Sequence, residues 1–211
     1  MGVQIIPSIL TSDENELKKM ATAFESLVDL IQIDIADGIF VPNTTIGPEQ
    51  VEALDTTLDF QIHLMVSKPE NHVCRWLQTP ASNFIVHVES TDKMDNIFKM
   101  FEDVEASLAL TLNPKTPVEK IVPYLDLVDY IQFMAVEPGF YGSKFDESVL
   151  EKIKEFHFLY PDVVIQVDGG VNDKTITQLK ETGATRFVVG SYIMKSENPK
   201  EAIEKLTGLA R

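Results

Sequence analysis

Residues 163–172 form an apolar run that ends in an aspartate, two glycines and an asparagine suited to capping a helix. Side chains alternate along a strand, so Gln166 and Asp168 share one face. Asp168 can act as an acid or a base, while Gly169 and Gly170 let backbone N–H groups approach a ligand closely. Asn172 can cap a following helix, whose N-terminal end favours phosphate. The segment therefore predicts acid–base chemistry beside a phosphate, although Asp-Gly-Gly also occurs in ordinary strand-to-helix turns.

The elements that would position this aspartate repeat along the whole chain. Eight apolar segments of strand length alternate with amphipathic helical stretches, a pattern typical of β–α units around a parallel sheet, with room for one helix after each strand. The expected strands are residues 4–8, 30–36, 60–66, 83–89, 107–113, 130–136, 163–169 and 185–191. We predict one domain, residues 1–211, folded as a closed (β/α)8 TIM barrel. The alternative is an open doubly wound sheet, but no G-x-G-x-x-G follows the first strand, so dinucleotide binding has no support.

Three helix starts are visible in the sequence. Thr11 with Glu14 predicts a capping box, Asp146 begins a helix that reaches Tyr160, and residues 198–209 start with Asn-Pro and predict a last helix.

Polar residues fall on one face of the strands when each is read with a period of two. They are Gln4, Ser8, Gln32, Asp34, Gln61, His63, His87, Glu89, Gln132, Gln166 and Asp168. We assign this face to the barrel interior, where such groups can hydrogen-bond in layers or surround a ligand. Those nearest the C-terminal ends should ring the mouth: Ser8, Asp34, His63, Glu89, Met134 and Asp168. The lower glutamines are predicted to be structural. We favour a hydrogen-bonded interior role for His87 over a second metal pair with Glu89.

Composition limits the classes of partner. The 211 residues are 44% apolar and carry a formal net charge of -15, which argues against nucleic acid or an anionic membrane. The single cysteine, Cys74, excludes an intramolecular disulfide, and no basic, apolar leader or membrane-spanning run is seen, so we expect a cytoplasmic protein. A phosphate ligand would be small and bound locally by glycine-rich turns, with Lys144 and Lys195 as candidate helpers.

Motifs spread over nearly the whole chain resemble the ribulose-phosphate 3-epimerase family. They are Ile-Pro-Ser-Ile-Leu at 6–10, Ile-Asp-Ile-Ala-Asp-Gly at 33–38, Phe-Val-Pro-Asn at 40–43, His-Leu-Met-Val at 63–66, Leu-Asn-Pro at 112–114, Val-Glu-Pro-Gly-Phe at 136–140, Val-Asp-Gly-Gly-Val at 167–171 and Val-Gly-Ser at 189–191. The resemblance implies a TIM barrel of the pentose phosphate pathway that interconverts ribulose 5-phosphate and xylulose 5-phosphate. It assigns the acid–base pair to Asp34 and Asp168. Their strands, the second and seventh of a ring of eight, would face one another across the mouth.

The resemblance also implies the substrate contacts and a homo-oligomer, either a dimer or a hexamer. The implied contacts are Ser8, His63, Met65, Met134, Gly139, Phe140, Tyr141, Gly142, Gly169, Gly170, Gly190 and Ser191. The competing interpretation is that these glycines serve only the turns and that Ser8 only ends a strand.

A divalent metal is implied as well, to stabilise the enediolate formed when the C3 proton leaves. The ligands that match the family are Asp34, His63 and Asp168, but Gln32 replaces a further histidine. An amide oxygen is a poorer donor for zinc, iron(II) or cobalt and suits magnesium or manganese better, so all five metals are candidates and weaker binding is expected. Ala36 and Ile39 replace a methionine and a histidine of the family.

Tyr141 replaces a glycine beside the expected phosphate path, so the mouth should differ in shape. Three functions stay open: a pentulose-phosphate 3-epimerase, which we favour, a 3-epimerase for a related hexulose phosphate, and a divergent sugar-phosphate-binding barrel with little or no epimerase activity.

Overall fold

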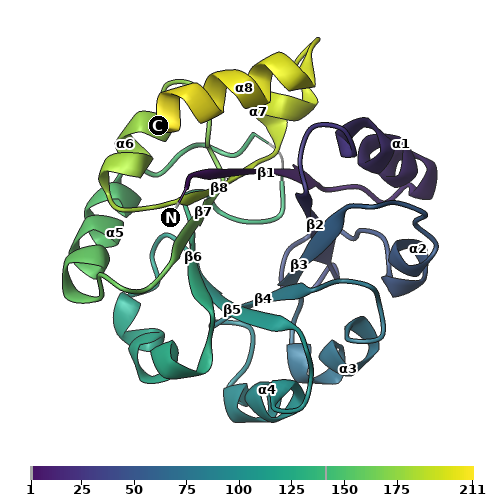
Figure 1. The fold of residues 1–211 in the computed structure, drawn as a ribbon. Coiled ribbons are helices and arrows are strands. Elements are labelled where there is room, and N and C mark those ends of the chain that lie inside the picture. The colour runs from purple at the N-terminus through teal and green to yellow at the C-terminus, as the bar shows by residue number, and fades with distance from the viewer. Residues whose placement is uncertain (1, 141) are drawn as a thin grey trace.

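The computed structural model describes residues 2–140 and 142–211, and its eight strands close into one parallel barrel in the order β1 to β8 (Figure 1). The strands are β1 (Gln4–Ile9), β2 (Leu30–Ala36), β3 (Asp59–Met65), β4 (Asn83–His87), β5 (Ser107–Leu112), β6 (Tyr130–Met134), β7 (Ile165–Asp168) and β8 (Arg186–Val189). Each strand pairs only with its two neighbours, and β1 pairs with β8 to close the ring. The prediction of a TIM barrel is therefore confirmed.

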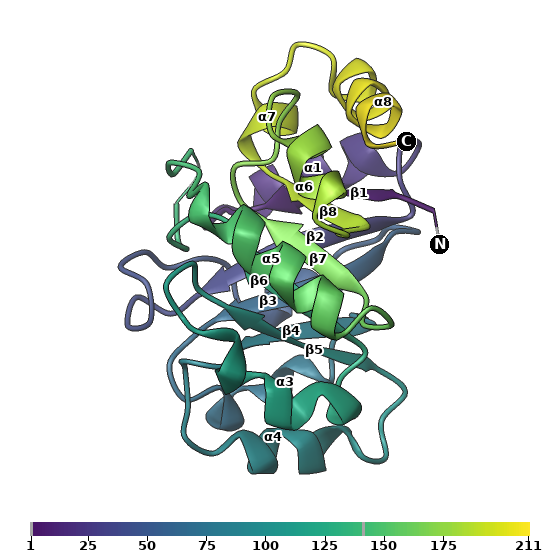
Figure 2. The ribbon, with the colours of Figure 1, turned by 90° about the vertical axis from the view of Figure 1, so that its left-hand side faces the viewer.

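Helices cover the outside of the barrel, and Figure 2 views it from the side on which α5 and α6 lie. The α-helices are α1 (Glu14–Phe24), α2 (Pro48–Glu52), α3 (Val73–Trp76), α4 (Met94–Phe101), α5 (Ser148–Leu159), α6 (Ile176–Glu181), α7 (Ser191–Met194) and α8 (Pro199–Ala210). The described residues also form three 3-10 helices: η1 (Pro69–Asn71), η2 (Val118–Lys120) and η3 (Val122–Leu127). No helix among the described residues is both long and apolar enough to cross a membrane.

The first helix begins differently from the predicted capping box. Asp13, not Thr11, is the N-cap of α1, and its carboxylate accepts hydrogen bonds from the backbone N–H groups of Asn15 and Glu16 at 2.7 and 2.9 Å. The Thr11 hydroxyl instead donates to Glu16 and accepts from the backbone of Asp13. The other two helix starts are close to prediction, since α5 begins two residues after Asp146 and Asn198 caps α8.

The connection after β5 contains the two 3-10 helices η2 and η3 in place of the expected α-helix. Pro114, Pro117 and Pro123 lie in this connection. A proline has no N–H to donate and its ring clashes with the preceding turn, so three of them within ten positions interrupt a continuous helix. The expectation of one α-helix after every strand is wrong here for that reason.

Two different interiors result from the alternation of side chains along the strands. Residues that point outward, such as Ile33, Ile62 and Phe133, pack under the helices and form the main apolar core. Residues that point into the barrel include four glutamines, Gln32, Gln61, Gln132 and Gln166, all fully buried. The predicted polar interior is thus confirmed for these four, while Gln4 at the open end of β1 is exposed.

Candidate active site

One pocket opens at the C-terminal ends of the strands, where TIM barrels carry their active sites. It is lined by Ser8, Leu10, Asp34, His63, Met65, Met134, Val136, Pro138, Gly139, Phe140, Gly142, Ser143, Asp168, Gly169, Gly170, Val171, Gly190 and Ser191. Every predicted catalytic or substrate-contacting residue that the structure describes is in this set. Tyr141 lies outside the described residues.

Several predicted residues lie elsewhere. Gln32 is buried beneath the pocket floor. Glu89, expected at the mouth, does not line the pocket, because its carboxylate turns to accept a hydrogen bond from the backbone N–H of Asn113 at 2.7 Å. Neither Lys144 nor Lys195 lines it either, although the Lys195 ammonium lies 4.0 Å from where a Cβ on Gly142 would be.

Five lining residues were not predicted: Leu10, Val136, Pro138, Ser143 and Val171. Each lies within three positions of a predicted site residue along the chain. These five residues could therefore have been found from the sequence, because each shares a strand end or a loop with a predicted site residue.

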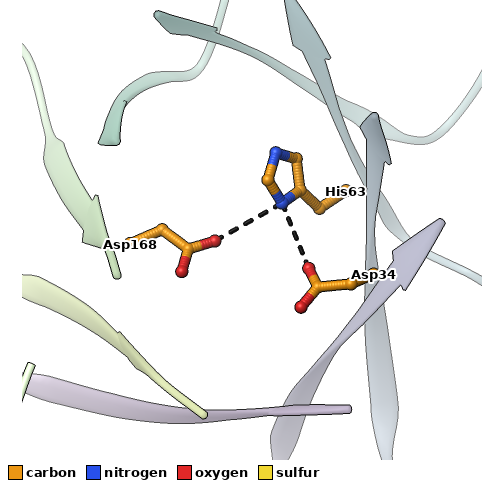
Figure 3. Close-up of side chains that lie close together, drawn as sticks. All are labelled: Asp34, His63 and Asp168. Atoms are coloured by element: carbon orange, nitrogen blue, oxygen red, sulfur yellow. Dashed lines mark hydrogen bonds and ion pairs between the residues drawn. The ribbon is translucent and has the colours of Figure 1, made fainter. Parts of the chain in front are cut away.

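The floor of the pocket brings together Asp34 of β2, His63 of β3 and Asp168 of β7 (Figure 3). Asp34 and His63 are direct partners in the register of β2 and β3, so their side chains project side by side. His63 Nδ1 lies 3.1 Å from Asp34 Oδ1 and 3.4 Å from Asp168 Oδ2. Imidazole and two carboxylates thus converge on one point from three strands.

This convergence changes the proton affinities of the groups. Burial alone would lower the pKa of His63, but its interactions with Asp168 and Asp34 raise that pKa to about 9. Burial and the negative charge of Asp168 raise the pKa of Asp34 above its ordinary value, although bonds from His63 and Gln32 oppose the rise. The imidazole of His63 therefore carries a proton at neutral pH and offsets part of the carboxylate charge.

Gln32 lies directly below this trio and contacts all three members. Its amide nitrogen donates to Asp34 Oδ1 and to Asp168 Oδ2, both at 2.7 Å, and lies 3.4 Å from His63 Nδ1. Its amide oxygen accepts a hydrogen bond from Gln61 Nε2 at 2.7 Å. This buried amide is the only direct link between the two carboxylates other than His63 among the bonds of the described residues.

A second histidine lies behind His63. His87 is fully buried, and its Nε2 atom lies 2.9 Å from His63 Nε2. Its Nδ1 atom lies 3.4 Å from Glu89 Oε2, an ion-pair distance without the alignment of a hydrogen bond. Burial lowers the pKa of His87 to about 4 despite the nearby Glu89 carboxylate, so His87 is neutral. The interior, hydrogen-bonded histidine expected from the sequence is confirmed.

The residues present fit a divalent metal ion. Asp34, His63 and Asp168 each offer one ligand atom, and all three atoms lie within 4.8 Å of one another. Two ligands of a tetrahedral zinc ion are roughly 3.4 Å apart, close to the spacings from His63 Nδ1 to the two aspartates. Imidazole nitrogen and carboxylate oxygen are both donors found in catalytic metal sites, where three protein ligands leave a position open for water or substrate.

Backbone geometry explains the glycines after β7 without any ligand. Gly169 and Gly170 have φ angles of 98° and 67°, which L side chains rarely adopt. A Cβ on Gly169 would lie 2.4 Å from Val136 Cγ2, and one on Gly170 would lie 2.7 Å from Phe145 Cδ2. Asn172 caps the turn that follows, accepting from the backbone N–H of Lys174, and α6 itself begins only at Ile176.

Two of the substituted positions lie away from the reacting groups. Ala36 is buried in a small apolar cluster with Val41 and Met65 and does not line the pocket. Ile39 is 77% exposed and also lies outside the pocket.

Comparison with solved structures agrees with the fold. Solved structures with the same fold include 3-hexulose-6-phosphate synthase, at a TM-score of 0.72 and 16% identity over the whole of both chains. They also include KGPDC from Streptococcus mutans, at a TM-score of 0.75 and 17% identity, covering 100% of this chain and 98% of the other. At such identities the likeness shows the fold alone.

Sequence similarity is much closer to one group of enzymes. The ribulose-phosphate 3-epimerase of Bacillus subtilis (strain 168) is 36% identical, with 98% of this chain and 99% of the relative covered. The ribulose-phosphate 3-epimerase of Schizosaccharomyces pombe is 34% identical, covering 96% of this chain and 92% of the relative. Residues 4–194 match the sequence model of the Ribulose-phosphate 3 epimerase family. The chain therefore belongs to the ribulose-phosphate 3-epimerase family, whose members are isomerases that act on carbohydrates.

Proposed function

We propose that the protein interconverts ribulose 5-phosphate and xylulose 5-phosphate by inverting C3, with Asp34 and Asp168 as the acid–base pair. The observation that carries the proposal is the convergence of these two buried carboxylates from β2 and β7 on one side of His63 Nδ1. The strands are three steps apart around the ring, so the carboxylates approach the pocket from different directions. Inversion needs such an arrangement, because the proton leaves one face of the carbon and returns to the other.

Each aspartate alternates between base and acid according to the direction of the reaction. The raised pKa of Asp34 supports this role, because a carboxyl that ionises nearer to neutrality is both a stronger base and an available acid. Met65 and Met134 at the pocket wall exclude water from the reacting carbon, which strengthens the electrostatic interactions there.

Asp34, His63 and Asp168 would hold one divalent metal ion. When bound, the ion stabilises the negative charge that develops on the substrate oxygens after the proton leaves. To hold the ion, His63 would release its proton and offer Nδ1. Zinc, iron(II), manganese, cobalt and magnesium are all retained as candidates.

The phosphate is assigned to the loops that follow β6, β7 and β8. Gly139, Gly142, Gly169, Gly170, Gly190 and Ser191 all line that side of the pocket. In a chain with a net charge of -15, backbone N–H groups bind a small anion without a basic surface. Ser8 at the end of β1 is assigned to the substrate hydroxyls.

The direct test is deuterium incorporation at C3 of ribulose 5-phosphate in D2O, followed by NMR. Chelator-treated protein is supplied in turn with magnesium, manganese, zinc, iron(II) and cobalt. Exchange that accompanies xylulose 5-phosphate formation supports the proposal. Saturable phosphate binding without exchange under every metal would refute it and favour a sugar-phosphate-binding barrel.

A panel of hexulose 6-phosphates in the same assay tests the alternative substrate, because faster inversion of a hexulose would transfer the assignment to that sugar. We also propose a homo-oligomer located in the cytoplasm. Light scattering of the purified protein and cell fractionation test these two points.

A further inference from the structure

The amide nitrogen of Gln32 lies close to all three candidate metal ligands. It lies 2.7 Å from Asp34 Oδ1, 2.7 Å from Asp168 Oδ2 and 3.4 Å from His63 Nδ1. A histidine from this position of β2 could reach the same point and complete a four-ligand site. Which end of the Gln32 amide faces the aspartates therefore decides how many ligands the chain offers.

Two hydrogen-bonded residues, Arg186 and Gln61, determine the orientation of the Gln32 amide. Arg186 of β8 can only donate hydrogen bonds, and its guanidinium donates to Gln61 Oε1 at 3.0 Å. The Tyr130 hydroxyl donates to the same oxygen at 3.4 Å. Gln61 must therefore turn its NH2 group the other way, where it donates to Gln32 Oε1 at 2.7 Å.

Gln32 in turn has its oxygen committed to Gln61, and only its NH2 group faces the aspartates. The flipped amide would set its NH2 against the NH2 of Gln61 and its oxygen against two carboxylates. The first contact would have no acceptor and the second no donor, and Gln32 and Gln61 are fully buried, where unpaired polar groups are costly. Only one orientation of the two amides therefore gives every hydrogen bond in the series Arg186, Gln61 and Gln32 both a donor and an acceptor.

We infer that Gln32 is a positioning residue that donates to both Asp34 and Asp168 and is not a metal ligand, and that Arg186 fixes this orientation through Gln61. The inference deepens the proposed function, since it gives the metal three protein ligands in place of four. It is independent of which sugar is the substrate.

Calorimetry together with the visible absorption spectrum of bound Co²⁺ tests the ligand count. Gln32→Leu keeps the approximate volume but removes both the oxygen and the donor. Its Co²⁺ affinity should fall by about 10- to 100-fold at most, because two ligands lose their hydrogen-bond donor. The visible absorption bands of bound Co²⁺, which report the ligand set, should keep their positions in Gln32→Leu and shift in Asp34→Asn. Gln166→Leu is the matched control, because Gln166 is an equally buried glutamine that bonds to Gln132 and does not touch the cluster. A shift of the Co²⁺ absorption bands in Gln32→Leu but not in Gln166→Leu would show that Gln32 ligates the ion and overturn the inference.

Gln61→Glu tests the role of the series in orienting the amide. A carboxylate at this position accepts from Arg186 but has no proton for Gln32, so the Gln32 amide should turn and present its oxygen to the cluster. In this background the further change Gln32→Leu should shift the absorption bands of bound Co²⁺, because it now removes a ligand oxygen, in contrast to the unshifted bands expected for Gln32→Leu alone. Equal effects of Gln32→Leu in both backgrounds would contradict the orienting role.

NMR of the chelator-treated protein separates this inference from the proposed function. The side-chain NH2 signals of Gln32 are assigned by their loss in Gln32→Leu. They should shift in both Asp34→Asn and Asp168→Asn and exchange slowly with solvent. Signals unaffected by both changes would refute the donor role even if the epimerase assay succeeded, and shifted signals would support it even if that assay failed.

Discussion

His63 Nε2 and His87 Nε2 lie 2.9 Å apart in the closed interior of the barrel, so one of the two nitrogens carries the hydrogen between them. When His63 Nδ1 serves a metal, Nε2 of the same ring bears the hydrogen and His87 must accept it. The neutral form of His87, favoured by burial, allows that. His87 therefore sets the tautomer in which His63 would bind a metal ion.

Replacing His87 should weaken metal binding although His87 touches no metal. We expect His87→Phe to lower Co²⁺ affinity by about 10- to 100-fold, because His63 loses the acceptor that fixes its orientation. Calorimetry measures the change, and circular dichroism checks the fold. His87→Gln, which restores an acceptor oxygen, should recover part of the affinity; equal losses in both variants would point to packing as the cause.

Metal affinity should depend on pH through His63. Its pKa is about 9 in the chelated protein, so a metal must displace a proton at neutral pH. Affinity should rise about tenfold per pH unit up to pH 9 and then level off. Calorimetry in buffers of different ionisation enthalpy should detect about one proton released per ion at pH 7.5. No release would mean that His63 is already neutral.

The same shift makes the stability of the chelated protein pH-dependent. The pKa of His63 is raised from an ordinary value of 6.5 to about 9, so its protonation stabilises the fold fully below pH 6.5. That stabilisation is lost as pH rises through 9. Urea unfolding between pH 6.5 and 9.5 should show the decline, and His63→Gln should remove it. A decline of equal size in that variant would assign it to other groups.

Removal of either carboxylate should abolish inversion. Asp34→Asn and Asp168→Asn should each reduce xylulose 5-phosphate formation by at least about a thousandfold, because each removes one proton carrier. Both variants should remain folded, since an asparagine oxygen can still accept the hydrogen bond from Gln32. Full activity in either one, measured in the NMR assay with saturating metal, would rule out the two-aspartate mechanism.

Gln32→His should tighten the binding of Zn²⁺ and Co²⁺ by about tenfold or more, because imidazole is a stronger donor than an amide for these ions. Mg²⁺ affinity should change less. Calorimetry of Gln32→His and of the original protein with all three ions measures the difference. An unchanged Zn²⁺ affinity would mean that a side chain at position 32 cannot reach the ion.

Strand positions were predictable because the apolar runs and the period-two pattern depend on neighbouring residues only. The predicted first and last residues of the strands were less accurate than the strand positions. The predicted strand 83–89 stops at His87, since the chain turns there and Ser90 bonds back to the carbonyl of His87. The predicted start at 163 is delayed to Ile165 by a turn in which Val163 N–H bonds to Tyr160. Such turns depend on single hydrogen bonds that periodicity does not reveal.

The candidate site was also largely predictable, because strand-end residues of a parallel barrel meet at one face. Asp34, His63 and Asp168 were identified by their place on the strands and by resemblance. The orientation of Gln32 was not, since it depends on Arg186, which lies more than 150 positions away in the sequence. Glu89 was misplaced because nothing local signals its bond to the backbone of Asn113.

The orientation of the buried glutamine amides affects how substitutions in related barrels should be interpreted. A glutamine amide accepts a hydrogen bond at one end and donates at the other. Residue 186, which is partly exposed at the base of the barrel, therefore specifies through Gln61 which atom of Gln32 faces the reacting carboxylates at the opposite end. Two relatives with identical pocket linings could therefore differ in metal requirement. A comparison limited to the residues that touch substrate would overlook the difference.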